Sequence, residues 1–121
     1  MAYYSFSEHN SGVAPIVPIK AGAASLDALI DTGAQINVLP AEYRDKYGLI
    51  QTDSVLTIQD GAGRLEEVKK YKVRYNIQNN EIEMYCILTV HNVALIGLEL
   101  LKHFNLSLHD GGFELTEVNN G

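Results

Sequence analysis

At residues 29–35 the chain reads LIDTGAQ, an apolar run that is broken by an aspartate, a hydroxyl residue and a glycine. An apolar strand that ends in this way holds the Asp31 carboxylate rigidly and partly away from water. Gly33 lets the loop turn tightly and lets another backbone approach closely. The Thr32 hydroxyl can hydrogen-bond a neighbouring backbone group. A carboxylate displayed on such a loop is suited to acid-base chemistry.

A second carboxylate of this kind is missing from the sequence. Two carboxylates about 3 Å apart cannot both ionise, so they share a proton, and one can act as a base on water while the other acts as an acid. The chain has no second Asp-Thr-Gly or Asp-Ser-Gly, and Asp60-Gly61 and Asp110-Gly111 are turn signals without a preceding apolar strand. If Asp31 works in such a pair, its partner comes from a second copy of the chain across a two-fold axis.

Outward from this motif the pattern is one of short strands divided by turns. Hairpin tips are predicted at 60–63 and around 79–80, because glycine and asparagine tolerate the positive φ angles of tight turns. A last hairpin is predicted over 106–118. Short helices are predicted at 40–47 and 98–104. The sequence therefore predicts an all-β domain with one or two short helices.

Composition excludes several classes of function. The net charge of -6 disfavours a nucleic-acid surface, which needs clustered Lys and Arg. The one basic cluster, residues 69–74, follows Glu66 and Glu67 and is interpreted as the solvated face of a strand. The four histidines have neither an i, i+4 pair nor a His-x-Glu spacing, so no metal site and no cofactor are expected.

The single cysteine, Cys86, lies in an apolar run and is interpreted as a small buried hydrophobe. No apolar run is long enough to span a bilayer, so no membrane partner is expected. The first residues lack the apolar region of a signal peptide, so secretion by an own signal is not expected. We expect a flexible N-terminal tail at 1–12, one domain at 13–118 and a frayed C-terminus at 119–121.

The heptapeptide at 29–35 resembles the active-site motif of retroviral and LTR-retrotransposon aspartic proteases, the retropepsins. The stretch ALIGLELL at 94–101 is similar to the later motif of that family, an apolar pair, a glycine and a short helix. Residues 58–63, IQDGAG, lie where the family has its Gly-rich flap, and 107–115 resembles the C-terminal hairpin of the gammaretroviral branch. These elements come in family order.

The resemblance implies a closed barrel-like retropepsin fold that dimerises and cleaves peptide bonds as an aspartic endopeptidase. It implies Asp31, Thr32 and Gly33 as the catalytic motif. It also implies a set of residues that bind an extended peptide or polyprotein substrate: Leu29, Ala34, Gln35, Val38, Asp60, Gly61, Ala62, Gly63, Val93 and Leu95. A cytoplasmic or virus-particle-like location goes with such a role.

The sequence departs from the family pattern at two positions. Most viral relatives have an arginine where this chain has Leu98, and it pairs with an aspartate where this chain has Gln35. Without that ion pair, we expect the dimer to be held by the C-terminal hairpin, whose alternation gives one apolar face: Leu106, Leu108, Phe113 and Leu115. The alternative function is a catalytically silent module that only dimerises or binds peptides, although an intact Asp-Thr-Gly argues against it.

Overall fold

The structure is a computed structural model that describes residues 2–9, 12–59 and 61–118. Most of these residues lie in strands, as predicted, and two short helices interrupt them. In chain order the elements are β1 (Ala2–Ser5), β2 (Ser7–His9), β3 (Gly12–Ala14), β4 (Ile16–Ala21), β5 (Ala24–Ile30), β6 (Asn37–Pro40), η1 (Ala41–Lys46), β7 (Ile50–Gln59), β8 (Leu65–Ile77), β9 (Asn80–Thr89), β10 (Ala94–Ile96), α1 (Leu98–Leu101), β11 (Phe104–Leu108) and β12 (Gly112–Glu117).

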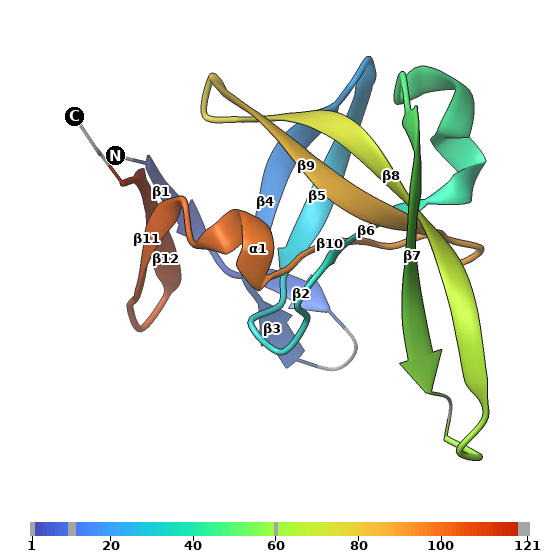
Figure 1. The fold of residues 1–121 in the computed structure, drawn as a ribbon. Coiled ribbons are helices and arrows are strands. Elements are labelled where there is room, and N and C mark those ends of the chain that lie inside the picture. The colour runs from blue at the N-terminus through green and yellow to red at the C-terminus, as the bar shows by residue number, and fades with distance from the viewer. Residues whose placement is uncertain (1, 10–11, 60, 119–121) are drawn as a thin grey trace.

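Six of the strands form a closed barrel in the order β4-β5-β10-β6-β9-β8, and β8 pairs back to β4 (Figure 1). Alternate residues of each strand fill the interior, because side chains in a strand point to opposite faces. In β5, for example, Ala28 and Ile30 are buried while Leu29 between them is half-buried. The predicted barrel-like fold is therefore confirmed, and the outward residues of these strands remain available for other contacts.

The seam that closes the barrel is short. The strands β4 and β8 pair only at Lys20 with Asn76 and at Ala21 with Tyr75. In this register Ile19 would face Ile77 and Pro18 would face Gln78, and Pro18 has no N–H to donate. Opposite this part of β4, strand β8 ends at Ile77, and the chain enters a turn at Gln78, whose φ is 55°. Pro18 therefore lies where the seam opens.

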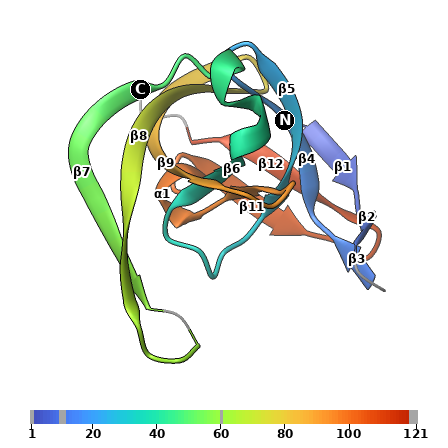
Figure 2. The same cartoon turned by 90° about the vertical axis from the view of Figure 1, so that its right-hand side faces the viewer.

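A long hairpin of β7 and β8 projects beyond the barrel (Figure 2). Its described tip residues 61–63 form the predicted turn, in which Gly63 has a φ of 83° that favours glycine. Asp60, also predicted for this tip, lies outside the described residues. In both views the tip extends toward the same side of the barrel as the loop that joins β5 to β6.

The N-terminal segment differs from the loose tail that we expected over residues 1–12. Strand β1 pairs with β12, and β2 pairs with β3. The prediction rested on the polar composition of the segment and did not consider its aromatic residues Tyr4 and Phe6. Their ring centroids lie 5.2 and 6.0 Å from that of Phe113. Burial of aromatic surface outweighs the cost of ordering the segment. The C-terminal residues 119–121 lie outside the described part of the chain.

Together β1, β12 and β11 form a separate three-stranded sheet. Phe113 and Leu115 of this sheet are buried in the core of the single chain, and Leu106 packs against that core. The expectation that the whole apolar face of the hairpin awaits a second copy is therefore wrong. Of that face, Leu108 stays exposed at 68%.

The two helices are shorter or tighter than predicted. The first, η1, is a 3-10 helix in which Tyr43 leaves helical geometry. The second, α1, ends at Leu101, because its buried Leu100 and Leu101 already meet the core and Phe104 begins β11. Among the described residues, no helix has the length and apolar character needed to cross a membrane.

Candidate active site

Asp31 stands directly after β5, at the end of the barrel's parallel pair of β5 and β10. This pair aligns Leu29 with Leu95 and Ile30 with Ile96. The Asp31 backbone N–H donates to the Ile96 carbonyl oxygen at 2.9 Å, which extends the ladder by one bond. The aspartate is thus held by a buried strand of the barrel, as the sequence predicted.

The loop after Asp31 folds back on its carboxylate. The Gly33 N–H donates to Asp31 Oδ1 at 2.9 Å, and the Ala34 N–H donates to the Asp31 carbonyl oxygen at 3.2 Å. A hydrogen bond from a backbone N–H to a carboxylate oxygen fixes the direction of that oxygen. Asp31 is half-buried, and Thr32 and Gly33 are exposed. The carboxylate is therefore oriented and still reachable from outside.

The Thr32 hydroxyl has no hydrogen-bond partner within the described residues. The sequence predicted such a bond to a neighbouring backbone group. In the single chain this donor remains available for a group of another molecule.

The support beneath the loop comes from Gly97 and Asn37. The Gly97 N–H donates to Asn37 Oδ1 at 2.9 Å, and Asn37 Nδ2 donates to the Tyr85 carbonyl oxygen at 3.2 Å. Asn37 is completely buried. Sequence reasoning missed it, although an asparagine between Ile36 and Val38 in an apolar strand was a usable signal, because buried polar groups are nearly always paired.

The backbone of α1 also holds the loop. The Leu98 N–H donates to the Ala34 carbonyl oxygen at 2.8 Å, and the Glu99 N–H donates to that of Gln35 at 3.2 Å. These bonds satisfy free donors of the first helical turn. The Asn37–Gly97 hydrogen bond joins residues that are 60 positions apart in the sequence. The motif around Asp31 and the motif around Gly97 therefore form one structural unit.

An apolar groove of about 670 Å³ runs between this loop and the β7–β8 hairpin. Three residues that the resemblance implied for substrate binding line it, namely Ala34, Gln35 and Val38. The sequence analysis did not single out the others as lining a site: Ile36, Leu56, Thr57, Ile58, Lys70, Met84, Tyr85, Ile87 and Glu99. Their strands could be predicted, but which strands face each other across a groove depends on barrel closure.

The remaining implied residues lie apart from this groove. Leu29 and Val93 line a second hollow, of about 350 Å³. Leu95 is the Cα partner of both Leu29 and Val38, so it lies between the two hollows on the outward side of the barrel. Residues 61–63 line neither hollow in this single chain.

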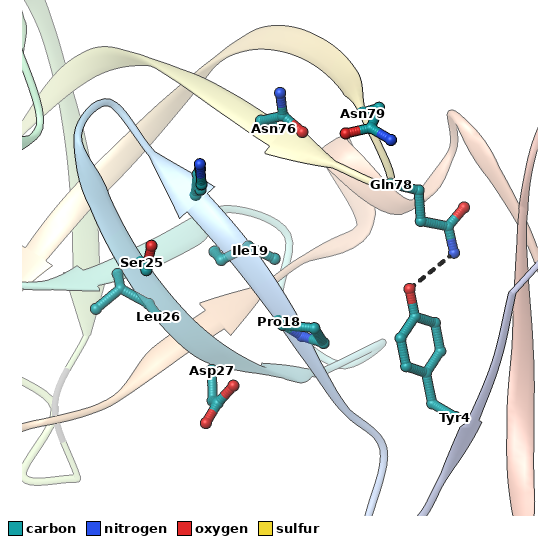
Figure 3. A pocket seen from close by; sticks show the side chains of 10 residues that line it. Tyr4, Pro18, Ile19, Ser25, Leu26, Asp27, Asn76, Gln78 and Asn79 are labelled. Atoms are coloured by element: carbon teal, nitrogen blue, oxygen red, sulfur yellow. Dashed lines mark hydrogen bonds between the residues drawn. The ribbon is translucent and has the colours of Figure 1, made fainter.

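A third hollow, of about 580 Å³, lies where the barrel seam opens (Figure 3). There Gln78 Nε2 donates to the Tyr4 hydroxyl oxygen at 3.1 Å and to the Leu115 carbonyl oxygen at 2.9 Å. Asp27 is its only carboxylate among the described lining residues, and its side chain points away from the Tyr4–Gln78 pair in Figure 3. We interpret this hollow as the joint between the barrel and the terminal sheet.

The chemistry that the chain offers is that of a lone oriented carboxylate. Within the described ranges, no group of three or more His, Cys, Asp or Glu side chains could hold a metal ion. The sequence contains a single Asp-Thr-Gly. A reaction that needs two Asp-Thr-Gly carboxylates would therefore take the second from another chain.

Comparisons with known proteins agree with this architecture. Residues 12–109 match the family model described as "Retroviral aspartyl protease". The fold is similar to that of the EIAV protease, solved in complex with the inhibitor HBY-793, with a TM-score of 0.59 and 19% identity, over 79% of this chain and 92% of that chain. It is also similar to the simian foamy virus (mac) protease, with a TM-score of 0.57 and 15% identity, over 69% and 88% of the two chains. The comparison with curated proteins gives no match.

Proposed function

Because the chain belongs to the retroviral aspartyl protease family, we propose that it is an aspartic endopeptidase that works as a homodimer. The observation that carries this proposal is the Asp31 carboxylate, which stands at the end of a barrel strand with one oxygen held by the Gly33 N–H at 2.9 Å. A silent dimerisation or peptide-binding module would have no use for a carboxylate that is oriented and accessible.

In this proposal the two copies of Asp31 meet across a two-fold axis and share one proton, as carboxylates at close range must. The ionised carboxylate takes a proton from a water molecule, which attacks the peptide carbonyl carbon. The protonated carboxylate donates to the carbonyl oxygen, which gives a tetrahedral intermediate. The carboxyl group that took the water proton then donates it to the peptide nitrogen as the C–N bond breaks. The Gly33 N–H keeps Oδ1 in place, and the free Thr32 hydroxyl donates to the backbone of the second copy across the interface.

The substrate in this proposal is an extended peptide that lies between the Asp31 loops and the β7–β8 hairpins. The groove lined by Ala34, Gln35 and Val38 takes one of its side chains. The hollow lined by Leu29 and Val93 takes another, with Leu95 between the two. The hairpin tip, described at residues 61–63, closes over the peptide and excludes water, which is the usual role of a mobile loop over a hydrolytic site.

Mass spectrometry of the products from a mixed peptide library tests the proposal. We expect cleavage by the unaltered chain, unchanged by a metal chelator, and loss of cleavage to background in Asp31→Asn. Circular dichroism and sedimentation of Asp31→Asn are expected to match the unaltered chain, because the substitution removes charge and little else. Cleavage that persists in Asp31→Asn would overturn the assignment.

Binding without turnover would favour the silent module instead. Saturable binding of library peptides by a folded dimer, with no product over long incubation, is that outcome. The polyprotein nature of the substrate and the cytoplasmic or virus-particle-like location stay predictions.

A further inference from the structure

The apolar groove beside the Asp31 loop has a lysine side chain, that of Lys70, in its lining. Its walls are aliphatic, with Val38, Leu56 and Ile87 among them, and Lys70 also lines it. Lys70 Nζ lies 4.3 Å from the centroid of the Tyr85 ring, which is another lining residue. The groove therefore has an apolar body and a positive edge.

A second ammonium group reinforces this edge. Lys72 Nζ lies 5.2 Å from the same Tyr85 ring. The register pairs Lys72 with Tyr85 across β8 and β9, and Lys70, two residues away, is on the same face of the strand. Both lysines are half-buried. The interpretation of residues 69–74 as a solvated strand face is wrong for these two, although it holds for the exposed Lys69 and Arg74.

The positive charge at this edge is not neutralised by the described part of the chain. Neither Lys70 nor Lys72 forms an ion pair with a described carboxylate. The carboxylate that lines the groove, that of Glu99, pairs with Lys102 at 3.0 Å. This local excess of positive charge stands out in a chain whose net charge is -6.

We propose that this groove selects a substrate residue with an acidic side chain, above all glutamate, and that Lys70 and Lys72 are the residues that determine this specificity. The inference rests on the proposed protease function. The methylene groups of glutamate would pack on the aliphatic walls, and its carboxylate would reach the two ammonium groups. The two-fold axis supplies one such groove on each side of the cleaved bond.

Two physical effects make the preference measurable. The Tyr85 ring holds both ammonium groups in place by cation–π attraction, so less side-chain entropy is lost when a carboxylate binds. Partial burial lowers the local dielectric, which strengthens a charge pair relative to one in open water. A lysine in the same position would meet like charges. A glutamine would keep the apolar contacts and lose the charge pair.

The test compares three peptides that carry Glu, Gln or Lys at each position flanking a bond that the protein cleaves. At one position on each side we expect the Glu peptide to have a kcat/KM higher than the Lys peptide, on the order of tenfold, as two partly buried ion pairs give. Raising the salt concentration is expected to shrink this ratio, because the charges are screened. Equal rates for the three peptides at every position would overturn the inference.

Substitutions assign the preference to its residues. Lys70→Met, which keeps the apolar stem and leaves the charge of Lys72, is expected to reduce the Glu preference. The double variant Lys70→Glu, Lys72→Glu is expected to reverse the order of the Glu and Lys peptides. Lys69→Met is the matched control for Lys70→Met: it changes the net charge equally, but Lys69 is exposed, with its Nζ 5.7 Å from the centroid of a different ring, Tyr71. A Glu preference of unchanged size in Lys70→Met, or one that survives the double variant, would also overturn the inference.

Peptide binding to the Asp31→Asn variant separates this inference from the proposed function. Fluorescence anisotropy of labelled Glu, Gln and Lys peptides reports the groove without any need for turnover. A Glu preference in binding with no cleavage by the unaltered chain would support the groove and overturn the protease. Cleavage without a Glu preference would support the protease function and overturn the inference about the groove.

Discussion

At the residue scale, the contact between Gly97 and the Asp31 loop leaves no room for a side chain. A Cβ at Gly97 would lie 2.7 Å from the Ala34 carbonyl oxygen and 2.8 Å from that of Ile36. The φ of Gly97 is -95°, which any residue adopts, so the glycine is needed for space and not for its backbone angle. The glycine of the motif at 94–101 therefore allows α1 to pack closely against the Asp31 loop.

We predict that Gly97→Ala lowers the free energy of unfolding by about 1–3 kcal/mol, the usual cost of overpacking, and lowers peptide cleavage as the loop shifts. Denaturant unfolding and a cleavage assay check this. Gly111→Ala is the control, because the nearest atom to its Cβ, the Tyr3 hydroxyl oxygen, is 3.7 Å away. Equal stability of the two variants would contradict the account of this contact.

Cys86 gives a prediction for alkaline pH. Burial raises the pKa of its thiol from the usual value of about 9 to about 12. The unfolded chain loses this proton first, so the stability is fully present below pH 9 and falls as the pH rises toward 12. The expected slope is about 1.4 kcal/mol per pH unit.

Urea unfolding between pH 8 and pH 10 measures the onset of this fall, about 1.4 kcal/mol in total over the two pH units. The buried Tyr47 and Tyr75, whose pKa values are also raised by burial from 10.0, add to the fall from about pH 10 upward. Cys86→Ala is expected to have a lower stability at pH 8, because it leaves a small cavity, but a flatter dependence on pH. The same slope in both proteins would show that Cys86 does not titrate in this way.

Single residues also show where prediction from sequence stops. Asp31 and its loop could be located because a strand ending in Asp-Thr-Gly is a local signal. The roles of Asn37 and Lys70 could not, because each depends on a residue brought close by the barrel, Gly97 for the first and Tyr85 for the second. Charge runs such as 69–74 do not reveal which members face a groove until the pairing of the strand is known.

At the scale of elements, Gln78 fastens the terminal sheet to the barrel. It occupies a turn with a φ of 55° and hydrogen-bonds both Tyr4 and Leu115. The side-chain amide thus joins β1 and β12 to the end of β8. Tyr4, Gln78 and Pro18 line the same hollow, where the barrel seam opens.

We predict that Gln78→Ala lowers stability by about 1–2 kcal/mol, the cost of losing two hydrogen bonds, and speeds amide exchange in β1 and β12 more than in β5. Asn79→Ala is the control. Asn79 has a similar φ of 66° in the same turn, and no side-chain hydrogen bond of its own is found in the described chain. Exchange that speeds up equally in all three strands would contradict the role of Gln78 as a local link.

Elements near the motif could be predicted better than those at the chain ends. The apolar run before Gly97, part of the motif at 94–101, forms β10. The turn predicted around residues 79–80 lies one residue earlier, at Gln78 and Asn79, because Ile77 pairs with Asn80. Strand β1 was missed, since its partner β12 is more than 100 residues away in sequence, as the pair of Tyr4 with Phe113 shows.

At the scale of the whole molecule, a single substitution in the terminal sheet tests where the dimer contacts lie more sharply than deletion of the C-terminal hairpin does. The sequence predicts that deleting residues 110–121 gives an inactive monomer. That deletion would also remove the buried Phe113 and Leu115 and damage the fold of each chain. Leu108, exposed at 68%, can be changed without touching the core.

We predict that Leu108→Glu leaves thermal unfolding of the dilute chain nearly unchanged and weakens dimerisation by about a hundredfold or more. Burying each leucine contributes about 1.5–3 kcal/mol, two copies are lost, and 1.4 kcal/mol corresponds to a factor of ten. Sedimentation equilibrium measures the dissociation constant. An unchanged constant would place the dimer contacts elsewhere, for example at the exposed Leu98.

The central claim is that one active site needs an Asp31 from each of two chains. Refolding the unaltered chain together with Asp31→Asn, at constant total concentration, produces dimers at random. Only dimers with two aspartates should cleave, so activity should follow the square of the unaltered fraction and fall to about a quarter in an equal mixture. Activity that falls in direct proportion, to about a half, would show that each chain carries a complete site and would contradict the account.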